Sequence, residues 1–139
     1  MIWILYAFLS AIFAAAVAIL GKIGLQNVDS TLATAIRSIV MAVFLTSMAF
    51  ALNKFIVLKN IGNKALLFIV FSGLAGALSW LFYFLALKYG PATGVAAIDR
   101  LSVVFVVVLA ALLLGETLTT KSILGVVLLV IGAILLVIK

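Results

Sequence analysis

Apolar runs of about twenty residues recur along this chain of 139 residues, separated by short polar clusters. A helix rises about 1.5 Å per residue, so roughly 20 apolar residues are needed to cross about 30 Å of hydrocarbon. In total, 69% of the residues are apolar and 9% are charged, against roughly 45–50% and 25% in soluble domains. These proportions exclude a water-soluble fold and predict an all-α membrane protein.

Polar clusters and helix-ending residues divide the chain into five predicted transmembrane helices within a single domain, residues 1–139. Gly90 and Pro91 mark one boundary, because glycine favours the end of a helix and proline its first position, so Pro91 is expected to open the fourth span. Thr119 or Thr120 can cap the last span. The first segment lacks the basic region of a signal peptide and is predicted to span. The expected helices cover residues 2–21, 31–52, 65–87, 91–114 and 121–138.

Charge and residue usage exclude several functions. The net charge is +6, but the basic residues stand singly between apolar runs, so nucleic-acid binding is rejected. Cys and His are absent, which removes disulfides, thiolate nucleophiles, imidazole bases and most transition-metal sites. No phosphate-binding Walker loop is present, which excludes ATP-driven transport by this chain alone. We therefore predict no enzymatic activity, no cofactor and no metal site.

The lysines are distributed almost equally between the two sides of the membrane, so they only weakly favour one orientation of the chain. With the N-terminal side of the membrane called side A and the other side B, side A carries four lysines and side B three: Lys54, Lys59, Lys64 and Lys121 against Lys22, Lys88 and Lys139. Because a lysine and arginine excess in short loops sets orientation, this balance permits insertion in both directions or a weakly biased single one. Five spans are an odd number, so two oppositely oriented copies would form an inverted repeat, and we predict an antiparallel homodimer.

Three ionisable residues lie well inside predicted spans, where each costs about 2.5–3.5 kcal/mol near the helix centre. Counting along ideal helices places Arg37 about 9 Å from side B, and Asp99 and Arg100 about 11–12 Å from it. The same count places Trp80 about 10 Å and Tyr83 about 6 Å from side B. Three spans therefore contribute polar or aromatic groups to one layer.

Two interpretations of this layer stay open. Arg37 and Asp99 can form a buried ion pair that only fixes helix packing, with Arg100 extended toward side B. Alternatively, the two arginines and the carboxylate line a hydrated cavity of net charge +1 that holds a substrate carboxylate or phosphate. The predicted substrate-binding residues are Arg37, Ser79, Trp80, Tyr83, Asp99 and Arg100.

Gly125 and Gly132 stand seven residues apart in the last span. They form a smooth stripe on one helix face, which suits close helix packing. The contact can lie within one subunit or between two subunits, and the sequence leaves both open.

Residues 85–136 resemble the drug/metabolite transporter superfamily. The run Ala86-Leu-Lys-Tyr-Gly-Pro-Ala-Thr-Gly-Val-Ala, then Leu114-Gly-Glu-Thr-Leu-Thr, then Gly125 and Gly132, is similar to the second half of an EamA domain. The first three spans also resemble an EamA repeat, with Lys22 at the end of the first helix and an arginine inside the second.

This resemblance implies transport through a central cavity. Most EamA transporters fuse two such units, and this chain is similar to the small one-domain members expected to act as dimers. The small multidrug resistance proteins resemble the first, third, fourth and fifth spans. They carry an essential glutamate eight residues before the first-helix lysine, where this chain has Ala14. That departure, together with a net-positive layer, argues against proton-coupled export of lipophilic cations.

The sequence therefore predicts a secondary transporter of small polar metabolites, such as amino acids or organic anions, working by alternating access. Its partners would be a small-molecule substrate, the lipid bilayer and a second copy. Its location would be the inner (cytoplasmic) cell membrane, as a multi-pass protein. The alternatives are a non-transporting or flippase-type membrane subunit, which would need a partner chain, and a dual-topology ion channel.

Overall fold

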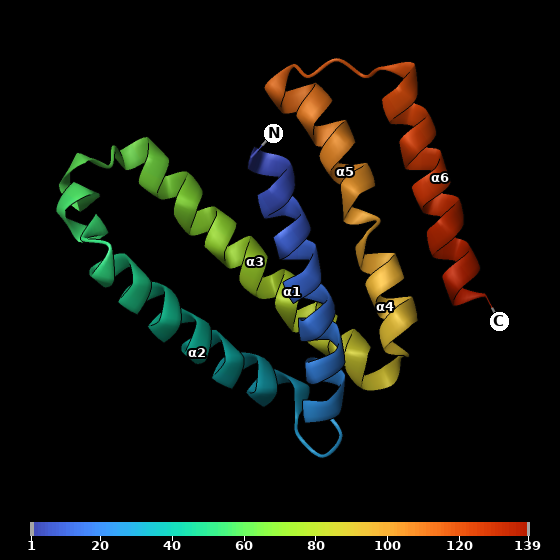
Figure 1. The fold of residues 1–139 in the computed structure, drawn as a ribbon, viewed down its shortest axis with the longest axis horizontal. Coiled ribbons are helices and arrows are strands. Elements are labelled where there is room, and N and C mark those ends of the chain that lie inside the picture. Colours follow the sequence, from blue (N-terminus) through green and yellow to red (C-terminus); the bar gives the residue numbers. More distant parts are fainter. Residues whose placement is uncertain (1, 139) are drawn as a thin grey trace. The chain divides into compact units, whose positions relative to one another are not determined.

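The computed structural model describes residues 2–138, and almost all of them are helical. Lys139, counted above for side B, lies outside the described residues. The helices are α1 (Ile2–Gly24), α2 (Ser30–Ala51), the 3₁₀ helix η1 (Lys54–Asn60), α3 (Asn63–Tyr89), α4 (Ala92–Asp99), α5 (Ser102–Leu109), the π-helical segment η2 (Ala110–Leu114) and α6 (Thr120–Val137), as drawn in Figure 1. No strand occurs in this described part, which confirms the all-α prediction.

Five stretches are long and apolar enough to cross a membrane, as predicted: α1, α2, α3, the combined stretch Ala92–Leu114, and α6. Their ends differ slightly from the predicted ones. The first helix was expected to end at Gly21, but it continues to Gly24. Neither glycine has a positive φ, so neither ends the helix by turning the backbone.

The described helices form two compact units. One combines α1 up to Leu20 with the chain from Tyr89 onward, which contains α4, α5, η2 and α6. The other runs from Gly21 to Lys88 and contains the end of α1, α2, η1 and most of α3.

In the unit of residues 21–88, the end of α1 packs closely against α3. A Cβ atom at Gly21 would lie only 3.2 Å from Cζ of Phe84. Phe84 and Leu87 are buried on α3, and Leu25, just after α1, is buried too. The Lys22 ammonium donates a hydrogen bond to the backbone carbonyl of Leu87, in the last turn of α3. A cation at this end is favourable because carbonyls without helical partners concentrate negative charge there.

In the other unit, α4 pairs with α6 through small residues. Gly94 and Ala97 of α4 and Ala133 of α6 are buried. A Cβ atom at Gly94 would lie 3.8 Å from Cγ2 of Val137, so α4 and α6 approach closely where Gly94 stands.

Side-chain caps begin two of the helices. The Asp29 carboxylate accepts hydrogen bonds from the backbone N–H groups of Thr31 (2.9 Å) and Leu32 (3.0 Å) and caps α2. The bond from Leu32 is the main cause that lowers the pKa of Asp29 below its ordinary value. The Thr119 hydroxyl accepts from the backbone N–H of Ser122 at 3.1 Å, which confirms Thr119 as a cap.

Pro91 precedes α4 instead of forming its first residue. Its backbone is extended (φ −69°, ψ 140°), and its carbonyl accepts a hydrogen bond from the N–H of Val95 at 3.0 Å. The prediction that Pro91 opens the fourth span is therefore off by one position, because the ring fixes φ but leaves ψ free to remain extended.

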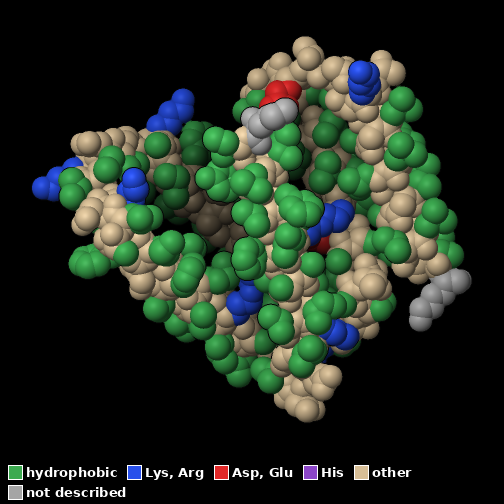
Figure 2. Space-filling view, viewed as in Figure 1, with side chains coloured by type: hydrophobic (Ala, Val, Ile, Leu, Met, Phe, Trp, Pro, Cys, Tyr) green, Lys and Arg blue, Asp and Glu red, His purple; other side chains and the backbone are tan. Residues whose placement is uncertain are grey.

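Large apolar side chains cover the outside of the helices, and Figure 2 shows them over most of the visible face. A soluble protein would bury many of these groups, whereas hydrocarbon is a favourable solvent for them. The chain is therefore a multi-pass membrane protein.

Candidate functional site

The inward face of the first half of α2 is polar. Ser30 and Thr34 are buried, and Arg37 is half-buried one turn further along. The Thr34 hydroxyl donates to the carbonyl of Ser30 at 2.7 Å, and the Ser38 hydroxyl donates to the carbonyl of Thr34 at 2.8 Å. These hydroxyl protons are thus engaged by the helix itself, which leaves Arg37 as the charged group on this face.

Arg37 stacks on an aromatic cluster of α3. Its guanidinium carbon lies 3.6 Å from the ring centroid of Trp80 and 5.3 Å from that of Phe84. Trp80 packs edge-on against Tyr83, with centroids 5.5 Å apart, and against Phe84, with centroids 6.1 Å apart. Spacings of three and four residues place these rings on one face of α3. Cation–π attraction of about 1–2 kcal/mol in such partly desolvated surroundings holds the guanidinium over the indole.

One nitrogen of Arg37 is left without a partner. Nη1 is buried, and no hydrogen-bond acceptor in residues 2–138 reaches it. An unpaired N–H of a charged group, shielded from water, costs free energy that an anionic oxygen would recover through a charge-assisted hydrogen bond. We call Arg37, Trp80, Tyr83 and Phe84 the Arg37 cluster; it combines a guanidinium that has one unpartnered N–H nitrogen with a group of packed aromatic rings.

The fourth predicted span is not one continuous α-helix. Helix α4 ends at Asp99 and α5 begins at Ser102, and Figure 1 shows the interruption between them. Asp99 ends α4, and Arg100 follows it in the turn; both are exposed. The prediction of a regular helix over residues 91–114 is wrong here, although the stretch is apolar enough to span.

Hydrogen bonding explains how the break is tolerated in an apolar segment. The N–H of Leu101 donates to the carbonyl of Ile98 (2.9 Å), and the N–H of Val103 donates to that of Arg100 (3.1 Å), so both bonds span three residues instead of four. These bonds keep the backbone largely paired but bypass the carbonyls of Ala97 and Asp99. Interrupted helices are often found at transporter sites, where such groups face a cavity or other protein.

A change in side-chain size accounts for the position of the break. Helix α4 carries small residues, which permit close packing on α6, whereas α5 is built almost entirely of valine, leucine and phenylalanine. Large side chains prevent α5 from continuing the same close approach. The helix is therefore interrupted at Arg100 and Leu101, where the small residues end and the large ones begin.

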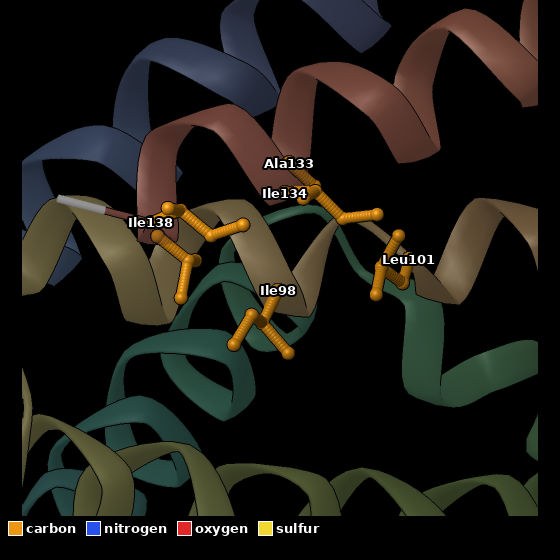
Figure 3. A pocket seen from close by; sticks show the side chains of 6 residues that line it. Ile98, Leu101, Ala133, Ile134 and Ile138 are labelled. Atoms are coloured by element: carbon orange, nitrogen blue, oxygen red, sulfur yellow. The ribbon is translucent and has the colours of Figure 1, made fainter.

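An apolar pocket of about 300 Å³ lies at this break, between the α4–α5 junction and α6. Figure 3 shows the side chains that line it: Ile98, Leu101, Ala133, Ile134, Val137 and Ile138. Sequence analysis missed it, because its two walls lie far apart in the chain. The pocket offers no side-chain hydrogen-bonding group and cannot by itself hold a polar solute.

The structure places the predicted substrate-binding residues in both units. Arg37, Trp80 and Tyr83 lie together, and Ser79 is exposed beside Trp80 in the chain. Asp99 and Arg100 lie in the unit of α4 to α6; that they share one chamber with Arg37 stays a prediction. Phe84 was missed, although its place four residues after Trp80 could have suggested it.

The glycine stripe of α6 stays partly open. A Cβ atom at Gly125 or Gly132 would meet no described atom within 4 Å. Nothing described in α4 or α5 therefore packs closely on this stripe, and a contact with a second subunit stays a prediction.

Comparison with known proteins agrees with this picture. Residues 1–138 match the model of the EamA-like transporter family. A Sinorhizobium protein named as an uncharacterized transporter in the cobO 3′ region is 40% identical over 134 residues, which cover 96% of this chain and 95% of that relative. No solved structure matches the chain. With its five apolar helices and a family match over nearly its whole length, the chain belongs to the EamA-like transporter family, within the drug/metabolite transporter superfamily.

Proposed function

We propose that this protein transports small polar metabolites that carry an anionic group, with Arg37 as the ligand of that group. The observation that carries the proposal is the buried, unpartnered Nη1 of Arg37 beside the ring of Trp80. Carboxylates such as those of amino acids and organic acids fit this site. The location that follows from this role is the cytoplasmic membrane.

The geometry of the stack favours an anion over a cation. The guanidinium keeps its charge at all physiological pH values, and its N–H groups point outward in its plane. The guanidinium carbon lies 3.6 Å from the centroid of Trp80, and the N–H donors of the same group are the atoms that would bind a carboxylate or phosphate. A lipophilic cation would be repelled by the same charge.

Alternating access suits the position of this site. Arg37 lies within a span, so a solute bound there must be reached from one side and released to the other. The interruption between α4 and α5 supports such a cycle, because a 3₁₀-type turn between two short helices is a natural place for bending. Asp99 and Arg100, on either side of the end of α4, are the further polar groups proposed to meet the solute.

The transporting unit is proposed to be an antiparallel homodimer. The chain has five membrane-spanning stretches, an odd number, so two inverted copies would build the inverted repeat of secondary transporters. The Sinorhizobium relative, of which the match covers 95%, is also one such unit in length. Single cysteines introduced near each end of this cysteine-free chain, labelled from both sides of intact vesicles, test this. Labelling of the C-terminal cysteine from one side only would refute it.

Uptake into proteoliposomes tests the proposed function. Counterflow of radiolabelled amino acids and organic acids should be saturable in the wild-type protein. Arg37→Gln should raise KM about ten- to a hundred-fold, because a charge-assisted hydrogen bond is worth about 1.5–3 kcal/mol. The KM of Arg37→Lys should lie between those of the wild type and Arg37→Gln, since lysine keeps the charge but not the planar arrangement of N–H donors. Lys121→Gln, an exposed charge loss on α6, is the control.

Stability separates this role from one in helix packing alone. Removing the guanidinium loses about 1–2 kcal/mol of stabilising cation–π attraction. It also removes the unpaired N–H donor, whose burial destabilises the folded protein by about 1–3 kcal/mol. Arg37→Met should therefore unfold close to wild type while losing uptake. Unchanged uptake would remove Arg37 from the mechanism. Uptake only with a second, different chain would favour a subunit role, and unsaturable flux would favour a channel.

A further inference from the structure

The segment that follows α2 and includes the first two residues of α3, residues 53–64, combines positive charge with exposed apolar groups. We call it the α2–α3 turn. Its three lysines, Lys54, Lys59 and Lys64, are exposed, and it contains no acidic residue. Residues 55–58 are Phe, Ile, Val and Leu, and their side chains are 45–76% exposed. Basic and apolar groups therefore meet on the same short stretch of surface.

The backbone sets this segment apart from the helices on either side. Asn53 adopts a left-handed conformation (φ 53°, ψ 30°), and its N–H donates to the carbonyl of Phe50 at 2.9 Å. This closes α2 and turns the chain out of its direction. Helix η1 then runs for seven residues, about 14 Å at the ~2.0 Å rise of a 3₁₀ helix, before α3 begins. Figure 1 shows it bridging the ends of α2 and α3.

The three-residue period of this helix sorts its side chains. Phe55 and Leu58 share one apolar face, because positions three apart are eclipsed in a 3₁₀ helix. Lys54 and Lys59 fall on the other two faces. Figure 2 shows Lys and Arg side chains gathered around this end of α2 and α3.

We propose that the α2–α3 turn lies flat in the membrane interface and binds the headgroups of anionic phospholipids. Both neighbouring helices cross the membrane, so the turn is held at the lipid surface. There its apolar face can enter the acyl boundary while the lysines contact phosphate groups. The three lysines and the absence of acidic residues supply charge complementarity to an anionic lipid. A soluble acidic protein would match the charge but leave the apolar face without hydrocarbon.

The binding is tested with the full chain in vesicles. Ile56, 76% exposed, is replaced by cysteine in this cysteine-free chain and labelled with a polarity-sensitive fluorophore. Vesicles contain phosphatidylcholine alone or with phosphatidylglycerol, and headgroup-region spin-labelled analogues of each lipid serve as quenchers. Spin-labelled phosphatidylglycerol should quench the fluorophore more strongly than spin-labelled phosphatidylcholine. The preference should be about fivefold for each lysine in full contact with the surface, and high salt should weaken it.

Charge removal supplies the matched comparison. The variant K54Q/K59Q/K64Q should lose the preference for phosphatidylglycerol, whereas K121Q should keep it, with circular dichroism showing an unchanged helix content in both. Equal quenching by the two lipids in the wild type, or a preference that survives in the triple variant, would overturn the proposal. Iodide in the water should quench the fluorophore only weakly if the turn lies in the interface. Full quenching by iodide that only added polyglutamate prevents would also overturn the proposal, in favour of a soluble acidic partner.

Discussion

Replacing Gly21 by leucine should disturb the contact between α1 and α3 that supports the Arg37 cluster. A Cβ atom at this position would lie 3.2 Å from Cζ of Phe84 and 3.4 Å from Cδ1 of Leu87. Both neighbours are buried, at 4% and 0% exposure, so room for a larger side chain has to come from displacing packed groups. Phe84 is also the ring whose centroid lies 5.3 Å from the guanidinium carbon of Arg37, so its displacement reaches the proposed anion site.

The expected magnitude follows from two opposing terms. Added methylene groups in a packed site cost about 1–3 kcal/mol. Replacing a helical glycine by a good helix former returns about 0.5–1 kcal/mol. The net loss in the free energy of unfolding should be about 1–2 kcal/mol, and KM for the anion proposed as the substrate should rise.

Gly24→Leu is the matched control, in the same helix and one turn further on. A Cβ atom at Gly24 would meet nothing within 4 Å, so only the gain in helix propensity remains. Unfolding of both variants in detergent micelles, followed by circular dichroism, measures the difference directly. Overpacking should lower the free energy of unfolding of the Gly21 variant by about 1–3 kcal/mol relative to the control. Free energies of unfolding within about 0.5 kcal/mol of each other would refute the close packing of α1 on α3.

Three further outcomes are expected. Lys22→Met should lower the unfolding temperature because the carbonyl of Leu87 loses its donor, whereas an equal effect from the exposed Lys64→Met would contradict this cap. Gly115→Ala should cost about 1–2 kcal/mol in thermal unfolding, because φ at Gly115 is +70° and a Cβ atom disfavours that backbone; no loss would show that the turn rearranges freely. The pKa of Asp29 is lowered by backbone N–H groups in the folded chain, so its cap stabilises above the unfolded pKa and is lost as pH falls through the folded value. Melting temperatures measured from about pH 6 to 2.5 should therefore fall below about pH 4 more steeply in wild type than in Asp29→Asn, and parallel curves would contradict it.

Much of the architecture can be predicted from the sequence because the membrane imposes a length. About twenty apolar residues are needed for each crossing, so the runs and the polar clusters between them reveal how many spans there are and where each lies to within a few residues. The cap of α6 can also be predicted from the sequence, because Thr119 precedes α6 and its hydroxyl accepts the expected backbone hydrogen bond. The α1 end was missed by three residues, since a glycine ends a helix only if its backbone turns.

The candidate site can be predicted only in part from the sequence. Counting residues along ideal helices gives Arg37 and Trp80 similar depths, but depth does not say which way a side chain points around its helix. The rotation of α2 and α3 about their own axes, which the sequence alone does not give, brings the guanidinium over the indole and leaves Nη1 unpaired.

Tertiary packing also decides the break in the fourth span. Mean hydropathy depends only on residue types, so it is the same for a continuous and an interrupted helix. Bonds that span three residues keep most of the backbone paired at the break, so an apolar segment tolerates it. What differs is the neighbour: the small residues of α4 fit closely on α6, and the large ones of α5 do not. The number of spans therefore followed from the sequence alone, because the thickness of the membrane fixes the length of each apolar run. The position of the break in the fourth span depended on how closely the side chains of α4 and α5 fit against α6.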